Sequence, residues 1–326
     1  MRCLICGGGG FVGGHLAKRL LQEGNEVRVA DIKPLNEWWQ LHPTAENMTL
    51  DLRRLDHADC ACRDMGQVYQ LAADMGGAGY IFSGDHDADV MHNSGLINHN
   101  ILDVGRITKA EKLFFSSSAC IYPANKQDVP DAPAMKESDA FPANPDSEYG
   151  WEKIFSERLY LAYARNYGLN VHIARFHNIY GHHGSYEGGR EKAPAAICRK
   201  VAAAKHSGKH EIEIWGDGSQ VRSFCWIDDC VEGIMRLMDS DCRQPLNVGS
   251  SESVTVNQLV DMVEKIADVT LKRHYKLDAP KGVAGRNSDN TMIQSVLGWQ
   301  PSTPLRVGME RTFRWIEEQY LQRKRG

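Results

Sequence analysis

A glycine-rich turn between an apolar run and a helical pattern is the feature that most constrains the fold of this chain. The apolar run covers residues 2–6, and the glycines of the turn are Gly7, Gly10 and Gly13. Apolar residues then recur with helical spacing as far as Gly24. Strand, glycine turn and helix in this order predict a dinucleotide site, because glycines let the backbone approach a pyrophosphate and the helix start offers free N–H groups. A glycine turn that binds nothing is the alternative.

An acidic residue stands where the next predicted strand ends. Residues 26–30 form an apolar strand pattern, and Asp31 follows it directly. A carboxylate there would accept hydrogen bonds from the adenosine ribose and repel a 2′-phosphate, so the sequence favours NAD over NADP. Asp51, after a short strand at residues 48–50, is a second candidate for the adenine side. The residues that we predict to contact NAD are Gly7, Gly10, Phe11, Val12, Gly13, Asp31, Asp51, Leu71, Ala72, Ala73, Tyr149 and Lys153.

A serine-rich strand end and a Tyr-x-x-x-Lys motif predict the reaction centre. The strand at residues 112–115 runs into serines 116–118 and then Cys120, where an open parallel sheet presents side chains to a ligand. Tyr149 and Lys153 are one helical turn apart and share a helix face. A lysine ammonium beside a phenol favours the phenolate, so Tyr149 could take and return a proton near neutral pH. An ordinary exposed helix pair is the alternative.

Alternating strand and helix patterns extend along most of the chain. Further strands are expected at residues 67–71 and 171–174, and helices at 93–110 and 154–167. Repeated βα units predict an α/β fold of the Rossmann type, with a doubly wound parallel sheet. At 326 residues the chain exceeds one average domain, so we expect a smaller C-terminal lobe that binds the substrate. We assign residues 1–178 and 219–249 to the NAD-binding domain, and residues 179–218 and 250–326 to the smaller lobe.

The smaller lobe carries basic residues near its turns. A helix is expected to open at residues 190–192, and Asp228 is expected to cap the helix that follows it. Four basic residues mostly flank glycine or proline turns: Lys192, Lys200, Arg222 and Arg286. Charged surface is the default interpretation of any one of them. As a set opposite a nicotinamide site they would suit a diphosphate, which guanidinium groups bind bidentately.

Composition and charge narrow the class of protein. Apolar residues at 42% and charged residues at 25% are ordinary for a soluble globular chain, and a net charge of −4 gives no reason to expect nucleic acid or a membrane as partner. The cysteines lack a paired metal-site spacing, and His182 and His183 have no evident third ligand, so no metal is predicted. No signal peptide or long apolar run is evident, and a reduced, cytoplasmic location is expected.

Several longer motifs resemble one family. Together with the glycine turn and the Tyr-Lys pair, they resemble the extended short-chain dehydrogenase/reductases, in their nucleotide-sugar branch. The resemblance covers essentially the whole chain, and within that branch it is strongest to the epimerases that act on carbons 3 and 5 of GDP-mannose. The motifs are Ala72-Ala-Asp-Met-Gly-Gly77, Ser117-Ser-Ala-Cys120-Ile-Tyr-Pro123, Gly188-Gly-Arg-Glu-Lys192-Ala-Pro194 and Gly285-Arg286-Asn-Ser-Asp-Asn290.

The resemblance implies roles for individual residues. It implies that Tyr149 is the redox base and that Lys153 is its NAD-bound partner. Cys120 and Lys192 would form the acid/base pair of epimerisation. The residues implied to contact the nucleotide sugar are Gly76, Ser118, Ala119, Cys120, Asn178, Glu191, Lys192, Ala193, Lys200, Gln220, Arg222, Ser223 and Arg286.

The resemblance also implies a reaction. NAD would oxidise carbon 4 of GDP-α-D-mannose, the ketone would acidify carbons 3 and 5, and reduction would follow inversion. The implied products are GDP-β-L-galactose and, by inversion at carbon 5 alone, GDP-L-gulose. A homodimer through helices near residues 93–110 and 147–167 is implied as well. The chain departs from the family at Gly8-Gly9 and over residues 31–47, which hold Trp38 and Trp39; this bears on the adenosine pocket.

Other functions of the same fold remain as alternatives. A 4-epimerase needs no acid/base pair beyond the redox site. A 4,6-dehydratase usually carries an Asp-Glu pair after the serine strand, where this chain has Ala119-Cys120, and this favours epimerisation beside the ketone. A non-catalytic NAD-sensing protein would be expected to lack Tyr149 or Lys153, and both are present.

Overall fold

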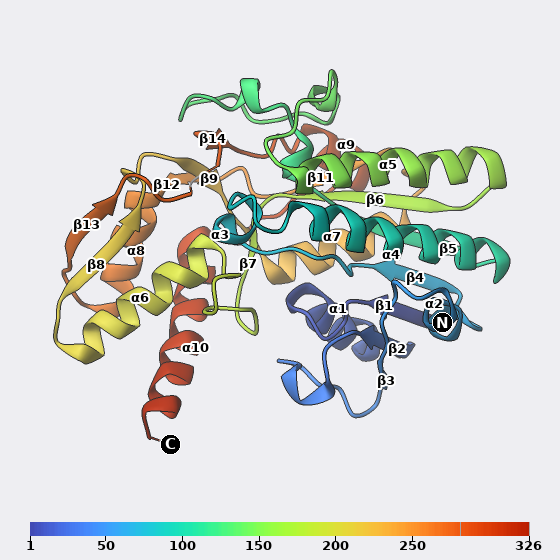
Figure 1. The fold of residues 1–326 in the computed structure, drawn as a ribbon, viewed down its shortest axis with the longest axis horizontal. Coiled ribbons are helices and arrows are strands. Elements are labelled where there is room, and N and C mark those ends of the chain that lie inside the picture. The colour runs from blue at the N-terminus through green and yellow to red at the C-terminus, as the bar shows by residue number, and fades with distance from the viewer. Residues whose placement is uncertain (281, 326) are drawn as a thin grey trace.

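The computed structural model describes residues 1–280 and 282–325 as a large and a small lobe (Figure 1). Within these residues, the large lobe is built on a seven-stranded parallel sheet in the order β11-β6-β5-β4-β1-β2-β3. The strands are β1 (Arg2–Cys6), β2 (Glu26–Asp31), β3 (Glu46–Thr49), β4 (Gln67–Gln70), β5 (Lys112–Ser118), β6 (Val171–Phe176) and β11 (Leu246–Val248). The order reverses between β1 and β4, which is the switch point where doubly wound sheets bind ligands. The predicted α/β class with a Rossmann-type sheet is confirmed.

Helices cover both faces of this sheet because its strands are apolar on both sides. In β1, Cys3 and Ile5 face one core, whereas Leu4 and Cys6 face the other, and all four side chains are completely buried. The helices are α1 (Phe11–Gln22) and α7 (Ile227–Asp239) on one face, and α2 (Leu55–Cys62), α4 (Asp87–Ile107) and α5 (Glu148–Tyr167) on the other.

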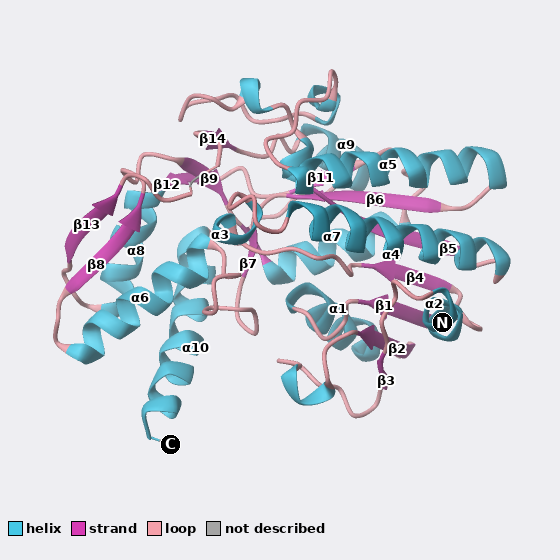
Figure 2. Cartoon of the chain, viewed as in Figure 1, coloured by secondary structure: helices cyan, strands magenta, loops and turns pink. Residues whose placement is uncertain are grey.

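The small lobe combines helices with short sheets, which lie to the left in Figure 2. Its helices are α6 (Ala193–Ser207), α8 (Val256–Ala267) and α10 (Leu305–Arg325). The strands pair as β8 (Glu211–Trp215) with β13 (Lys272–Lys276), β9 (Val221–Ser223) with β12 (Ser253–Thr255) and β14 (Gly285–Arg286), and β7 (Ile179–Tyr180) with β10 (Cys225–Trp226). Two further short helices lie elsewhere: α3 (Ala78–Ile81) follows β4 in the large lobe, and α9 (Thr291–Leu297) packs beside β11.

The helix α8 shows why these segments are helical. Leu259, Val260 and Val263 recur with helical spacing and are completely buried. Thr255 and Gln258 form a capping box: the Thr255 hydroxyl accepts from the Gln258 N–H at 3.0 Å, and the Gln258 side chain accepts from the Thr255 N–H at 2.8 Å. The buried face of α8 joins a core that continues from the large lobe into the small one.

Aromatic side chains also join the two lobes. Trp39 comes from the segment after β2, and its ring centroid lies 5.8 Å from that of Tyr186 and 5.4 Å from that of Trp315 on α10. The rings of Tyr186 and Trp315 lie 5.5 Å apart and meet edge to face. We call these three residues the aromatic junction. The segment between β2 and β3 therefore packs the large lobe against α10.

The structure corrects two predicted helix starts in the regions that matter for the site. The helix α6 begins at Ala193 rather than at residue 190, because Gly188 and Gly189 adopt positive φ and Pro194 suits the first helical turn. Asp228 does not cap α7: the helix begins after Trp226, and Asp228 lies in its first turn, where its carboxylate accepts a 3.0 Å hydrogen bond from the Trp226 indole.

Two helices of the large lobe begin earlier than predicted. The helix α4 spans Asp87–Ile107 rather than 93–110, with acidic residues in its first turn, where the helix dipole favours them. The helix α5 begins at Glu148, because the Ser147 hydroxyl accepts from the Gly150 N–H and caps it. Tyr149 and Lys153 therefore both lie within one helix.

Candidate active site

The glycine turn lies at the switch point of the sheet. Gly7 has a φ of +77°, and a Cβ there would lie 2.8 Å from the Cα of Ala72, just after β4. A Cβ on Gly13 would lie 2.5 Å from the carbonyl oxygen of Gly7. The helix α1 starts after Gly10 with no side-chain cap and no acidic residue in its first turn. This bare helix start, with Phe11 and Val12 as its first residues, fits a pyrophosphate.

The segment after β2 folds back over the glycine turn. Asp31 is buried at the end of β2, and its carboxylate accepts from the Lys33 N–H at 3.0 Å. The Lys33 ammonium donates to the Gly9 carbonyl at 2.7 Å, and a Cβ on Gly9 would lie 2.5 Å from the Trp38 indole nitrogen. Asp51 is engaged elsewhere, because both of its carboxylate oxygens accept 2.8 Å hydrogen bonds from Arg53. Asp31, the predicted ribose ligand, is therefore better placed than Asp51, the second candidate for the adenine side.

The predicted cofactor residues after β4 lie across the switch point from the glycine turn. The Leu71 N–H donates to the Cys6 carbonyl at 3.1 Å, which continues the β1–β4 pairing to the edge of the sheet. The Gln70 side chain then holds both backbone groups of Ala72, at 3.1 and 2.9 Å. Ala73 follows in a segment without regular secondary structure. These small residues leave the edge of the sheet open above the glycine turn.

Tyr149 and Lys153 lie beside the end of β5. The Lys153 ammonium is almost completely buried, 5.6 Å from the centroid of the Tyr149 ring and 4.9 Å from that of Phe115. Burial, together with Cys120 and Glu152, raises the pKa of the Tyr149 phenol above its ordinary value, although its hydrogen bond with Ser118 acts in the opposite direction. Desolvation therefore acts against the phenolate, and the effect of the Lys153 ammonium on Tyr149 stays a prediction.

A cavity of about 320 Å³ lies between the lobes, and Tyr149 forms part of its lining. It is lined by every residue predicted to contact the nucleotide sugar except Ser223: Gly76, Ser118, Ala119, Cys120, Asn178, Glu191, Lys192, Ala193, Lys200, Gln220, Arg222 and Arg286. Ser223 lies completely buried behind the wall, and its carbonyl accepts from the Asn178 side chain at 2.9 Å. Ser223 therefore supports Asn178 from behind the cavity wall. Lys153 also lies outside the lining.

Cys120 and Lys192 both face this cavity. An Arg286 N–H donates to the Cys120 sulfur at 3.1 Å, and the same guanidinium donates to Gln127 and Asp146, each at 2.7 Å. Burial lowers the pKa of the Lys192 ammonium below its ordinary value, and Cys120 is the largest opposing influence. A thiol beside a guanidinium and a lysine with a lowered pKa are groups suited to moving protons.

The remaining basic residues converge on the same space. The Arg222 guanidinium donates to the carbonyls of Val221 and Val283 at 2.7 and 2.5 Å, and burial together with Arg286 lowers the pKa of Arg222 to about 10. The Lys200 ammonium donates to the Glu213 carbonyl at 2.8 Å. This cluster of positive charge suits a diphosphate.

The sequence patterns do not predict the apolar wall of the cavity. Its members include Phe82, Trp215, Phe224, Val256 and Pro280. One signal could have revealed Trp215: in β8, Ile212 and Ile214 are buried, so the alternation places Trp215 on the outward face, where a large aromatic residue is unusual. The other residues of this wall have no such signal, because their patterns are those of ordinary core residues.

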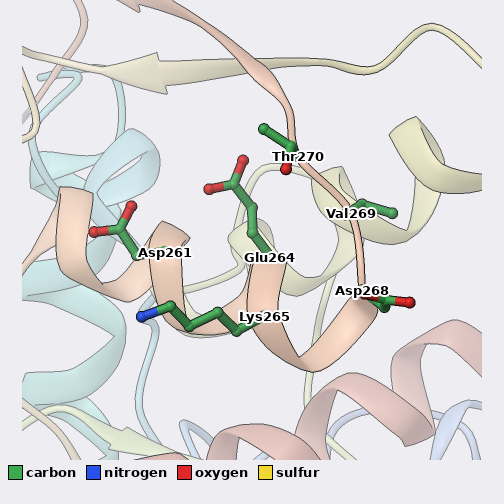
Figure 3. Close-up of a pocket in the computed structure, with 6 residues that line it drawn as sticks. All are labelled: Asp261, Glu264, Lys265, Asp268, Val269 and Thr270. Carbon is green, nitrogen blue, oxygen red and sulfur yellow. The ribbon is translucent and has the colours of Figure 1, made fainter.

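A second hollow lies at the end of α8 (Figure 3). It is lined by Asp261, Glu264, Lys265, Asp268, Val269 and Thr270. Arg273 already pairs with the carboxylates of Asp261 and Glu264. We interpret the hollow as ordinary charged surface. Across the described residues, no group of His, Cys, Asp and Glu side chains has the arrangement of a metal site.

The sheet, the glycine turn and the Tyr-Lys pair beside a basic cavity define an NAD-dependent enzyme of the dehydrogenase/reductase type. Residues 3–249 match the model of the NAD dependent epimerase/dehydratase family, and the chain belongs to that family. This confirms the predicted cofactor.

Relatives narrow the class further. The chain is 43% identical to GDP-mannose 3,5-epimerase 1 of Oryza sativa subsp. japonica and 42% identical to GDP-mannose 3,5-epimerase of Arabidopsis thaliana. Both matches cover 99% of this chain and 84% of the relative. The chain is less similar to UDP-glucuronic acid decarboxylase 5 of Arabidopsis thaliana, at 30% identity over 96% of this chain and 89% of the relative.

Solved structures show the same fold. UDP-glucose 4-epimerase of Thermotoga maritima superposes with a TM-score of 0.87 at 24% identity, covering 98% of this chain and 100% of that one. MoeE5, solved in complex with UDP-glucuronic acid and NAD, superposes with a TM-score of 0.82 at 26% identity, with the same coverage.

Proposed function

We propose that this protein epimerises GDP-α-D-mannose at sugar carbons 3 and 5. The products are GDP-β-L-galactose and, by inversion at carbon 5 alone, GDP-L-gulose. The observation that carries the proposal is the meeting of Cys120, Lys192 and Tyr149 in one cavity. The similarity to GDP-mannose 3,5-epimerases over nearly the whole chain supports it.

The chain binds the nucleotide sugar between its lobes. Lys200, Arg222 and Arg286 place positive charge along the cavity wall, where they would hold the diphosphate. The glycine turn, the start of α1 and Asp31 would hold NAD, which supplies a reversible hydride acceptor for sugar carbon 4. The cofactor and the sugar would meet beside Tyr149, at the carboxyl edge of the sheet.

Tyr149 accepts the proton of the carbon 4 hydroxyl and later returns it. Burial raises the pKa of the phenol, whereas positive charge from the nearby Lys153 ammonium and from the bound cofactor would favour the phenolate. Oxidation leaves a ketone at carbon 4, and a ketone acidifies the C–H bonds on both sides of it. This makes carbons 3 and 5 the positions where inversion becomes feasible.

Inversion needs one group to remove a proton and another to deliver one to the opposite face. The Arg286 guanidinium stabilises the negative charge that the Cys120 sulfur carries after it loses a proton. The lowered pKa of Lys192 increases the share of neutral amine that can accept a proton. We therefore assign Cys120 and Lys192 as the acid/base pair.

A homodimer through α4 and α5 is part of the proposal. Exposed apolar side chains lie on both helices, namely Met91 and Leu96 on α4 and Trp151 and Phe155 on α5. Such a patch suits burial against a second copy.

We also propose a cytoplasmic location, because nine cysteines are free thiols. None of the described helices is long and apolar enough to cross a membrane.

Product analysis in deuterated water tests the function directly. Purified protein is incubated with GDP-mannose without added NAD, and the sugars are identified by chromatography and NMR. We expect GDP-galactose and GDP-gulose that carry deuterium at the inverted carbons. A product changed only at carbon 4, or a dehydrated sugar, would reject the proposal in favour of a 4-epimerase or a 4,6-dehydratase.

A further inference from the structure

One loop of the small lobe lines the cavity and contacts the large lobe. It covers residues 188–192, and we call it the crossing loop. The Gly77 N–H donates to the Arg190 carbonyl at 2.9 Å, and a Cβ on Gly77 would lie 2.1 Å from the Glu191 carbonyl oxygen. The loop therefore touches the chain that follows β4. Its stem is Gly188 and Gly189, whose φ angles are +88° and +86°.

The Arg190 side chain fixes this crossing. Its guanidinium lies 3.9 Å from the centroid of the Tyr80 ring and donates to the Asp74 carboxylate at 3.2 Å. It also donates to the Met75 carbonyl at 3.3 Å. A planar guanidinium can stack and donate at once, which a lysine cannot do.

Asp74 is a fixed anion for this contact. Its carboxylate accepts from the Tyr80 hydroxyl and from the Asn93 side chain, each at 2.9 Å. Burial acts to raise the pKa of Asp74, but these hydrogen bonds and the charge of Arg190 hold that pKa below its usual value. Arg190 thus docks on a carboxylate already held by the large lobe.

Lys192 stands two positions after Arg190. Among the described residues, no hydrogen bond or ion pair holds its ammonium. The backbone of the crossing loop must therefore set where this side chain lies. Glu191 is held separately, through Gly189 at 2.7 Å and Arg199 at 3.2 Å.

We propose that Arg190 is a positioning residue: by docking the crossing loop on Asp74 and Tyr80, it holds Lys192 where it can exchange a proton with the sugar. The inference rests on the proposed function, since it assigns Arg190 a part in inversion and none in the oxidation at carbon 4. Cys120 and Tyr149 lie on the large lobe in the same apolar cluster as Tyr80, and among the described residues neither side chain is hydrogen-bonded to the crossing loop.

The test compares Arg190→Met, Arg190→Lys and Asp74→Asn with wild type. The Arg190 side chain is 52% exposed, so its loss leaves the fold intact. We expect Arg190→Met to slow inversion by about tenfold or more, since a misplaced reacting group can cost about 10²-fold. Oxidation at carbon 4 should persist, so reduced nicotinamide should accumulate. Arg190→Lys should recover part of the rate.

Arg314→Met, which removes an exposed arginine paired with Glu310 on α10, is the matched control and should behave as wild type.

The pH profile separates positioning from general damage. Burial lowers the pKa of Lys192, and release of the loop would admit water and return that pKa toward its ordinary value. The limb on which activity rises with pH should therefore move to higher pH in Arg190→Met. A proportional loss of oxidation and inversion with an unmoved profile would overturn the proposal, as would a wild-type rate.

Hydrogen exchange of the protein without substrate tests whether Arg190 docks the crossing loop. This measurement needs no reaction. Peptides covering residues 186–192 should exchange faster in Arg190→Met and Asp74→Asn than in wild type or Arg314→Met. Unchanged exchange would overturn the inference even if wild type made both products. If wild type made neither product while exchange rose as expected, the docking would stand and the proposed function would fail.

Discussion

The Arg286 guanidinium lies 3.1 Å from the Cys120 sulfur, although the two residues come from different lobes. Asp146 and Gln127 hold the same guanidinium, each at 2.7 Å, so its direction is set before substrate arrives. Although burial acts to lower it, Cys120 and Asp146 raise the pKa of Arg286 above its usual value. Arg286 therefore remains charged where the thiol needs a partner.

Arg286→Lys should expose this dependence. A lysine keeps the charge but cannot reach three partners from one plane. We expect inversion to fall by about 10- to 100-fold, which corresponds to the loss of one charged hydrogen bond of about 1.5–3 kcal/mol. Steady-state rates of product formation measure it. Arg236→Lys, in an exposed helix pair with Glu232, is the control. Equal rates for Arg286→Lys and wild type would contradict the assignment.

Cys120→Ala and Lys192→Met should each block inversion and spare oxidation at carbon 4. Neither change touches Tyr149, so reduced nicotinamide should accumulate when GDP-mannose is added, and near-ultraviolet absorbance follows it. In deuterated water, one variant should still exchange a ring proton from its own face without making a new epimer. Cys242→Ala and Lys265→Met change a thiol and an exposed lysine outside the cavity, and they should react normally. Normal inversion by both cavity variants would refute the two-faced mechanism.

Tyr149→Phe should abolish both steps together. It removes the phenolic oxygen but little volume, so nucleotide-sugar binding should be largely kept. General acid–base groups contribute about 10²–10⁴-fold, and a loss of that size is expected. Binding is measured by calorimetry and turnover by product analysis. Tyr167→Phe removes an exposed hydroxyl from the same helix and should change neither. Substantial turnover by Tyr149→Phe would rule it out as the redox base.

Asp31→Ala should weaken discrimination between NAD and NADP. The carboxylate accepts from ribose hydroxyls and repels a 2′-phosphate, so its loss should narrow the affinity ratio by about tenfold or more, equivalent to about 1.4 kcal/mol. Titration of cofactor-stripped protein with each dinucleotide measures the ratio. Asp51→Ala is the matched control, because Arg53 occupies that carboxylate. An unchanged ratio in Asp31→Ala would show that other groups select the cofactor.

Buried histidines should make the fold sensitive to acid. The ring of His15 lies 3.0 Å from the carbonyl of His182, and burial lowers the pKa of His15 from 6.5 to about 4. The unfolded chain therefore binds more protons between these values, and stability falls as pH falls. His15 alone should account for up to about 3 kcal/mol lost by pH 4. Thermal midpoints against pH measure this loss. His15→Gln should flatten the curve and the exposed His274→Gln should not; identical slopes would argue against it.

The sheet and the cofactor edge could be read from the sequence because their signals are local. The glycine turn, the apolar run before it and Asp31 lie within one βα unit, and short-range spacing decides their geometry. Tyr149 and Lys153 are likewise fixed by one helix. The resemblance to the family predicted the residues that contact the nucleotide sugar. Most of these residues do line one cavity.

Local sequence patterns do not predict contacts between segments that are distant in the chain. Nothing in the spacing of Arg286 and Cys120 indicates that they touch, and the same holds for Arg190 and Asp74. Desolvation of the Tyr149 phenol is likewise not visible in the sequence, whereas a neighbouring charge such as Lys153 is. The predicted cap at Asp228 is wrong because an acid in the first turn of a helix and a capping acid look alike in sequence.

The aromatic junction gives the protein an optical reporter of its own. Trp39 and Trp315 belong to different lobes, and their rings lie 5.4 Å apart. Two indole rings at such a short distance exchange excitation energy. Their fluorescence is quenched differently from that of separated rings. Any change in lobe spacing on ligand release would therefore alter the intrinsic emission, so domain movement can be timed in stopped flow without attaching a dye.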